Sequence, residues 1–382
     1  ALSGIEKGMN KQLQIGKDIY LSLDLRLQNL VNEELESTIE KFKASGGLSV
    51  ILNVNSGEIL ASSSLPDFNP NNINQYPKKN RFNSVTHGVF EMGSTFKTLT
   101  MAIAYDSKIV DDSDLFDVEE PIKVSKYTIQ DHHKIEGKIG IKEIIVNSSN
   151  IGAAKIAKLI GTGIQKEYLE KFGLLKKQEL EIPEIGTPLV PDPWLPINTM
   201  TIGYGYGLSV TPLQLCSVYS ALVNKGNLIN PTFLKGQKNN SLNKIINEET
   251  SLKVRNILRS VILESKWTGP RAKVPGYEVG GKTGTAELLE NSQYLKKANM
   301  SSFIGVFPIS KPEYVVLVMI KDPKGNEETY YNTTGAWVAA PTVSNIIKRM
   351  VNILGIPPLE NEQTYKAAMK KLFIMENNSA VF

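Results

Sequence analysis

The chain has 382 residues, of which 41% are hydrophobic and 21% charged, and its formal net charge is +4. This length and composition allow one large domain or two ordinary ones with a substantial core. No run of lysine and arginine stands out on one predicted element, so nucleic-acid binding gains no support. The single cysteine, Cys216, excludes an internal disulfide, and the longest apolar runs fall short of the ~20 residues of a membrane span.

The beginning of the chain predicts a linker, a short strand and an amphipathic helix. Residues 1–16 are polar and broken by glycine, which is typical of a linker or the end of a preceding module. Residues 19–23 suggest a strand, and Asp24 is suited to cap the helix that follows. Apolar residues keep helical spacing along one face of that helix: Leu27, Leu30, Val31, Leu35, Ile39 and Phe42.

The rest of the chain predicts a sheet assembled from distant segments. Residues 48–54 alternate as in a half-buried strand and turn at Asn55-Ser56-Gly57 into a second strand. A mainly helical middle follows, at about residues 88–265. A period of two then returns in three predicted strands, at residues 279–286, 302–307 and 314–320. A last helix is predicted at residues 337–354. We therefore expect an α+β fold, an antiparallel sheet flanked by helices with an inserted all-helical subdomain.

The first candidate for chemistry is Ser94-Thr95-Phe96-Lys97, directly after Gly93 and at the start of an apolar helical stretch. Positions i and i+3 share a helix face, so the serine hydroxyl and the lysine amine can meet. A neutral lysine there can take the proton of the serine. The same spacing recurs from Ser241 to Lys244, and an ordinary cap beside a solvated lysine is the simpler explanation of an isolated pair.

The second candidate is Ser148-Ser149-Asn150, between helical stretches at residues 141–146 and 151–160. A hydroxyl and an amide two residues apart on a tight turn can project into one cleft. There Ser148 would pass a proton between lysine and leaving group, while Asn150 would hold a substrate carbonyl. Taken alone, the pattern is more typical of a helix N-cap.

The third candidate is Lys282-Thr283-Gly284-Thr285, on a predicted strand after Gly280-Gly281. Alternation sends Lys282 and Gly284 to one face and Thr283 and Thr285 to the other, unless the strand is bent or twisted. The glycines let another backbone approach closely, as an extended peptide on a sheet edge requires. An edge strand weakened by glycine is the competing interpretation.

Together and in this order, the three motifs form the signature of the penicillin-recognising serine enzymes. The chain resembles the transpeptidase domain of a class B penicillin-binding protein of the division (septal) type. Five further segments carry the resemblance: residues 16–24, 55–61, 90–94, 205–214 and 302–308. It implies a transpeptidase domain at residues 17–355 with a helical subdomain at about 88–265, a cleft between subdomain and sheet, and a polar tail at 356–382.

The resemblance also implies roles for the motif residues. Ser94 would be the acylated nucleophile, Lys97 its base, and Ser148 and Asn150 would relay protons and orient the donor. The strand residues would face the terminal carboxylate of the donor: Lys282, Thr283, Gly284 and Thr285. The N–H groups of Ser94 and Thr285 would form an oxyanion hole, where one donor is typically worth ~3 kcal/mol. Burial and the charge of Lys282 would depress the pKa of Lys97, whereas Lys282 would stay charged against a carboxylate.

The implied reaction cross-links peptidoglycan stem peptides. Ser94 attacks a D-Ala-D-Ala bond, D-alanine leaves, and an amine on a neighbouring strand takes the acyl group, while β-lactam antibiotics trap the acyl-enzyme. No cofactor or metal is implied. Further expected partners are a membrane glycan polymerase and division proteins. The expected location is the extracytoplasmic (periplasmic) face of the inner membrane, with an anchoring segment that precedes residue 1.

Several alternatives stay open within the superfamily: an elongation-type transpeptidase, a D,D-carboxypeptidase and a penicillin-sensing receptor domain. A β-lactamase is disfavoured, because no convincing water-activating glutamate and asparagine follow Ser148-Ser149-Asn150. A Ser-His-Asp hydrolase is disfavoured by the lack of a Gly-x-Ser-x-Gly elbow. A metal site at Asp131-His132-His133 is conceivable, but adjacent histidines point apart, so a supporting role beside the site is the favoured interpretation.

Overall fold

The computed structural model describes residues 3–124, 127–237, 243–290 and 293–358. Its centre is a five-stranded antiparallel sheet in the order β11-β12-β13-β1-β2. The strands are β1 (Gly46–Asn53), β2 (Ile59–Leu65), β11 (Gly280–Glu290), β12 (Gln293–Phe307) and β13 (Tyr314–Lys321). The pairing of β1 with β13 runs from Gly46 opposite Lys321 to Asn53 opposite Tyr314. Two distant parts of the chain thus share one sheet, as the sequence predicts.

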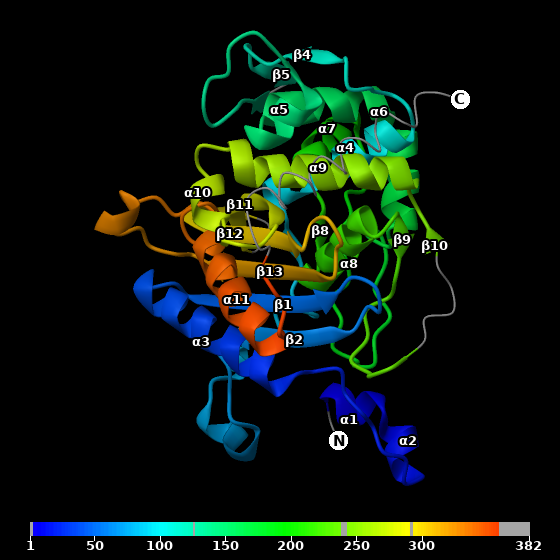
Figure 1. Ribbon diagram of the computed structural model, residues 1–382, viewed down its shortest axis with the longest axis vertical. Helices are drawn as coiled ribbons and strands as arrows, with labels where there is room; N and C mark the ends of the chain where they lie inside the picture. The colour runs from blue at the N-terminus through cyan, green and yellow to red at the C-terminus, as the bar shows by residue number, and fades with distance from the viewer. Residues whose placement is uncertain (1–2, 125–126, 238–242, 291–292, 359–382) are drawn as a thin grey trace.

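Helices cover both faces of this sheet (Figure 1). On one face, α3 (Leu25–Lys41) and α11 (Ala339–Leu354) lie together, joined by a 2.9 Å hydrogen bond between the hydroxyls of Thr38 and Thr342. Strand β13 sends Val316 and Val318 into the core with these helices and Leu317 into the core on the other face. Strand β1 is buried on both faces as well, so the prediction of a half-buried strand at residues 48–54 was wrong. Leu48, Val50 and Leu52 pack into the core on one face of the sheet, and Ile51 packs into the core on the other.

The N-terminal predictions hold in part. Helix α3 begins as predicted, because the Asp24 carboxylate accepts a 2.9 Å hydrogen bond from the N–H of Arg26. Residues 19–23 form no strand; they contribute a single bridge between Leu21 and Leu234. The segment predicted as a linker or as the end of a preceding module contains two short helices, α1 (Gly4–Gly8) and α2 (Asn10–Gln14).

A side chain of α3 forms hydrogen bonds with the backbone at the free edge of strand β2. The Gln28 amide accepts from the N–H of Ser62 at 2.9 Å and donates to the C=O of Ser62 at 3.1 Å. This amide makes the two bonds that a neighbouring strand would make, and so protects this part of the edge against pairing with another chain.

The inserted middle is mainly helical, but it is not all-helical. Its main helices are α4 (Phe96–Asp106), α5 (Ile141–Val146), α6 (Asn150–Lys171), α7 (Pro196–Gly203), α8 (Pro212–Val223) and α9 (Glu248–Glu264). Four two-stranded sheets accompany them: β3 (Phe90–Glu91) with β8 (Ser209–Val210), β4 (Leu115–Asp117) with β7 (Lys138–Gly140), β5 (Ile122–Val124) with β6 (Tyr127–Ile129), and β9 (Asn227–Leu228) with β10 (Asn243–Lys244). Strands of two or three residues are too short to show a period of two in the sequence.

The last short helix, α10 (Gly269–Ala272), precedes β11. Among the described residues, no helix combines the length and the apolar character that crossing a membrane would require. Ser241 and most of the predicted polar tail, from residue 359 onward, lie outside the described residues.

Candidate active site

Ser94 lies in a short 3-10 turn, η3 (Gly93–Thr95), which leads from strand β3 directly into helix α4. The turn uses Gly93 at φ +53°, a conformation that favours glycine. Gly205 packs against this turn: its C=O accepts from the N–H of Gly93 at 3.1 Å, and a Cβ on Gly205 would lie 1.9 Å from the oxygen of Gly93. The position of the serine therefore depends on two glycines far apart in the sequence.

Lys97 lies one turn further along α4 and reaches back to the serine. Its Nζ is 3.0 Å from Ser94 Oγ, 3.1 Å from Ser148 Oγ and 2.5 Å from the main-chain oxygen of Ser148. The side chain is fully buried. Burial, and then the positive charge of Lys282, hold the pKa of Lys97 well below its usual range. A neutral amine beside the hydroxyl can accept its proton.

The Ser148-Ser149-Asn150 turn joins α5 to α6, and its two serines make different contacts. Ser149 caps α6 by accepting from the N–H of Gly152 at 2.9 Å. Ser148 has φ +59°, which is uncommon for a residue with a side chain. This strained conformation accompanies the contacts of its hydroxyl with two lysines. The helix cap and the contacts of Ser148 with Lys97 and Lys282 thus coexist in this motif.

Asp131 holds this turn in place. Its carboxylate accepts hydrogen bonds from the N–H of Asn150, from the N–H of Ile151 at 3.0 Å and from the Ser149 hydroxyl at 2.7 Å. Four orphan N–H groups at a helix N-terminus make such a carboxylate favourable. The sequence singles out Asp131 only through its two histidine neighbours, and a supporting role is what the geometry shows.

Asn150 lies apart from the other predicted residues. Its side-chain amide donates to the main-chain oxygen of Gln130 at 2.9 Å, and Asn150 is not among the residues that line the cavity at Ser94. In this arrangement the amide fixes the segment before Asp131. Contact with a substrate carbonyl stays a prediction.

Lys282 completes the cluster from strand β11. Its Nζ lies 3.0 Å from Ser148 Oγ, 3.3 Å from the main-chain oxygen of Thr283 and 3.4 Å from Thr283 Oγ1. Only 1% of the residue is exposed, and burial lowers the pKa of Lys282 to about 7. Lys282 and Thr283 line one cavity although they are adjacent on a strand, so simple alternation does not describe this stretch.

At the two remaining strand residues, Gly284 and Thr285, other parts of the backbone approach strand β11 closely. A Cβ on Gly284 would lie 2.4 Å from Ser302 Oγ and 2.9 Å from the oxygen of Met92, so the site requires glycine. The Thr285 hydroxyl accepts from the N–H of Gly335 at 3.0 Å. A Cβ on Gly93 would lie 2.9 Å from the oxygen of Thr285, which places the strand directly beside the nucleophile turn.

These groups open into a cavity of about 450 Å³ between strand β11 and the inserted helices. Its walls include five of the predicted residues: Ser94, Ser148, Lys282, Thr283 and Thr285. Lys97 lies buried behind Ser94 and Ser148. The sequence predicts this convergence from three motifs that are spread over residues 94–285 of the chain.

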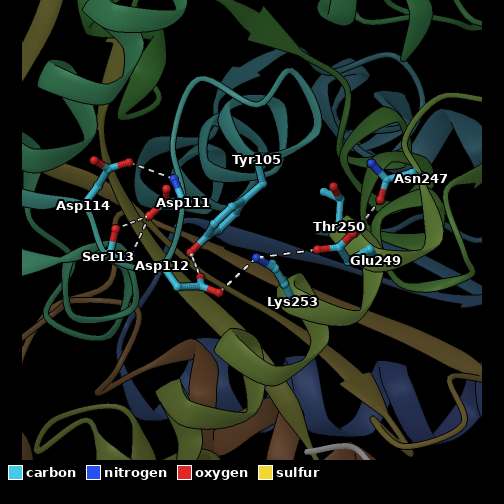
Figure 2. A network of polar contacts seen from close by, with 9 residues as sticks. All are labelled: Tyr105, Asp111, Asp112, Ser113, Asp114, Asn247, Glu249, Thr250 and Lys253. Atoms are coloured by element: carbon cyan, nitrogen blue, oxygen red, sulfur yellow. Dashed lines mark hydrogen bonds and ion pairs between the residues drawn. The ribbon is translucent and has the colours of Figure 1, made fainter. Parts of the chain in front are cut away.

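Two polar clusters that the sequence does not reveal support the nucleophile. At the far end of α4, Tyr105 donates to Asp112 at 2.7 Å, and Lys253 of α9 reaches the same carboxylate at 2.9 Å (Figure 2). Before the nucleophile, Glu91 accepts from the N–H of Gly207 at 2.6 Å and from the Tyr294 hydroxyl at 3.0 Å. Burial raises the pKa of Glu91. The first cluster ties α4 to α9, and the second ties strand β3 to Gly207 and to strand β12.

A serine at a helix start, a lysine one turn later, a second serine and a strand lysine define the class of penicillin-recognising serine enzymes. Comparison with known proteins gives the same assignment. Residues 47–348 match the family described as the penicillin binding protein transpeptidase domain. The chain therefore belongs to this family.

Relatives and a solved structure extend the match over most of the chain. The probable peptidoglycan D,D-transpeptidase FtsI of Caulobacter vibrioides is 33% identical over 370 residues, which cover 93% of this chain and 63% of that protein. The peptidoglycan D,D-transpeptidase FtsI of Escherichia coli is 30% identical, with 93% and 59% covered. The TP domain of Burkholderia pseudomallei penicillin-binding protein 3 has a TM-score of 0.78 at 29% identity, covering 90% of this chain and 98% of that one. The chain thus spans less than two thirds of these two curated relatives.

Proposed function

We propose that the chain is the catalytic domain of a peptidoglycan D,D-transpeptidase that acts in septal wall synthesis. The observation that carries the proposal is the cluster in which Lys97 lies 3.0 Å from the Ser94 hydroxyl while Lys97 and Lys282 share the hydroxyl of Ser148. The names of the two FtsI relatives support both the reaction and the septal role.

In the first step the neutral amine of Lys97 takes the proton of Ser94, and Oγ attacks the carbonyl carbon of the D-Ala-D-Ala bond. Negative charge develops on the carbonyl oxygen, where the N–H groups of Ser94 and Thr285 would stabilise it. The C–N bond then breaks, and the departing nitrogen receives a proton from Lys97 through the hydroxyl of Ser148. An ester on Ser94 and free D-alanine result.

The terminal carboxylate of the donor would lie against Lys282, Thr283 and Thr285. All three line the cavity beside Ser94. The pKa of Lys282, about 7 without a partner, would rise when a carboxylate binds, because an opposite charge favours the ammonium form. Lys282 would then be charged when the donor is bound, whereas Lys97 is neutral.

In the second step the amine of another stem peptide attacks the ester, and Ser94 regains its proton. A β-lactam carries the same carboxylate and a strained amide, so it would acylate Ser94 in place of the donor. The substrate belongs to the cell wall, which places the domain on the extracytoplasmic side of the membrane. A glycan polymerase and division proteins are the partners that this role requires.

The test is acyl transfer itself. The chain is incubated with a primary amine and a synthetic donor that ends in D-Ala-D-Ala. The products are identified by mass spectrometry. We expect the amide of donor and amine, and none with Ser94→Ala. Release of D-alanine with only the hydrolysed donor would indicate a D,D-carboxypeptidase instead. An adduct without turnover would indicate a penicillin sensor.

A further inference from the structure

The cavity that Ser94, Lys282 and Thr283 line also has an aromatic wall. The rings of His133 and Trp267 are stacked, with centroids 5.6 Å apart and planes 21° apart, and both residues line the cavity that contains Ser94. His133 comes from the segment before β7 in the inserted middle, and Trp267 from the link between α9 and α10. Trp267 is 53% exposed, so its indole offers free surface to a ligand in the cavity.

The wall is held in place by one arginine. Arg271 of α10 donates to the main-chain oxygen of Trp267 at 2.7 Å, and its guanidinium lies 3.3 Å from the ring centre of Trp337. Trp337 lines the same cavity and meets Tyr330 edge to face at 5.9 Å. The aromatic surface is thus fixed before any ligand arrives, which lowers the cost of ordering it on binding.

The aromatic wall is chemically suited to bind an amine at the end of an aliphatic side chain. Among the described residues that line the cavity, Asp131 is the only carboxylate, and its oxygens are occupied at the start of α6. An acceptor that approaches as an ammonium ion would therefore meet aromatic faces on its way to Ser94, and these faces attract a cation electrostatically. Methylene groups gain from covering the exposed indole as well.

Because the second step reverses the departure of the leaving amine, we expect this aromatic wall to contact the acceptor. In the proposed function, Lys282, Thr283 and Thr285 face the carboxylate of the D-alanine that leaves. Attack by an amine on the acyl-enzyme reverses the departure of an amine from it, so the attacking nitrogen takes the place that the leaving nitrogen vacated. The remainder of the acceptor would then lie in the same cavity, whose walls include Trp267 and His133.

We propose that Trp267 and His133 form the acceptor subsite, which takes a stem peptide by the primary amine at the end of its aliphatic side chain. This inference rests on the proposed function. The ammonium group loses one proton to solvent as it nears Lys282. Its nitrogen then attacks the ester carbon, the C–N bond forms and the bond to Ser94 Oγ breaks. The second proton passes through Lys97 to Oγ, which restores the serine and leaves a neutral amide.

The test compares two amines on one acyl-enzyme. The chain reacts with a diacetyl-lysyl-D-Ala-D-Ala donor in the presence of either a stem tripeptide with a free side-chain amine or hydroxylamine, which has no arm. We expect Trp267→Ala to lower the ratio of tripeptide transfer to hydrolysis about tenfold. Transfer to hydroxylamine and acylation by a labelled penicillin stay unchanged. Trp267→Phe restores most of the ratio, and Trp194→Ala, outside the cavity, is the matched control.

Each other result contradicts the inference. An unchanged tripeptide ratio in Trp267→Ala, or a wild-type chain that uses hydroxylamine but not the tripeptide, would overturn the acceptor subsite alone. Equal losses with both amines, or slower penicillin acylation, would assign Trp267 to the acyl-enzyme rather than to the acceptor. A wild-type chain that is acylated but transfers to neither amine would overturn the proposed function as well.

Discussion

Lys97 and Lys282 reach the same hydroxyl: their Nζ atoms lie 3.1 and 3.0 Å from Ser148 Oγ. Both side chains are essentially inaccessible to water, where two ammonium groups would repel each other strongly. Burial and this repulsion act together on the pKa of Lys97. The pair therefore favours a neutral Lys97 as base, and leaves Lys282 to meet the substrate carboxylate.

The first prediction concerns the neutral amine of Lys97. Lys97→Arg places a group that stays protonated beside Ser94, so acylation by a labelled penicillin should slow by about 10²–10⁴-fold. Lys97→Met should slow acylation to the same extent while leaving the melting temperature unchanged or higher, because it removes a buried ionisable group. Acylation of Lys97→Arg at the wild-type rate would contradict the assignment of the base.

The second prediction concerns pH and Lys282. Its pKa of about 7 in the free chain means that the ammonium form is lost as the pH rises through that value. The second-order rate of acylation by a penicillin should therefore decline above pH 7, because the carboxylate loses its charged partner. The methyl ester of the same penicillin, which has no carboxylate, should show no such decline. Identical pH profiles for acid and ester would argue against a carboxylate contact at Lys282.

The third prediction concerns Asp131, a positioning residue. Asp131→Ala frees the start of α6 and should slow acylation about 10- to 100-fold, because small displacements of reacting groups cost that much. Asp24→Ala is the matched control: it removes an N-cap on α3, costs about 1 kcal/mol of stability and should leave acylation intact. Equal acylation rates in the two variants would show that the turn at Ser148 does not need Asp131.

The fourth prediction concerns the contact behind the nucleophile. A methyl group on Gly205 would lie 1.9 Å from the oxygen of Gly93, so Gly205→Ala must displace the turn that carries Ser94. Acylation should fall at least about 100-fold. Gly163→Ala in helix α6 meets nothing within 4 Å and should raise stability by about 0.5–1 kcal/mol. Wild-type acylation in Gly205→Ala would show that the turn tolerates the displacement.

The sequence was most informative where chemistry demands particular residue types at a fixed spacing. Ser94 and Lys97 meet because they are three apart on a helix, and Asp24 caps α3 because a carboxylate suits that position. A period of two in the apolar residues likewise predicted the strands that join the two distant parts of the chain in one sheet.

Other features depend on tertiary contacts that a single sequence does not show. The strand at residues 48–54 was predicted as half-buried, because nothing local reveals that helices cover both faces. Asp131 serves the Ser148 turn from 17 residues away along the chain, a pairing without a sequence pattern. The hydrogen bond from the Asn150 amide to the carbonyl of Gln130 also follows no sequence pattern, and contact of Asn150 with a substrate carbonyl stays a prediction.

The most direct test of the account is the mass of the intact chain after incubation with a penicillin. If the hydroxyls of Ser94 and Ser148 and the amines of Lys97 and Lys282 act as one site, the wild-type protein gains the mass of one penicillin. Peptide mapping then places the adduct on Ser94. Ser94→Ala should gain nothing. An unmodified wild-type chain, or an adduct that persists in Ser94→Ala, would contradict the central assignment.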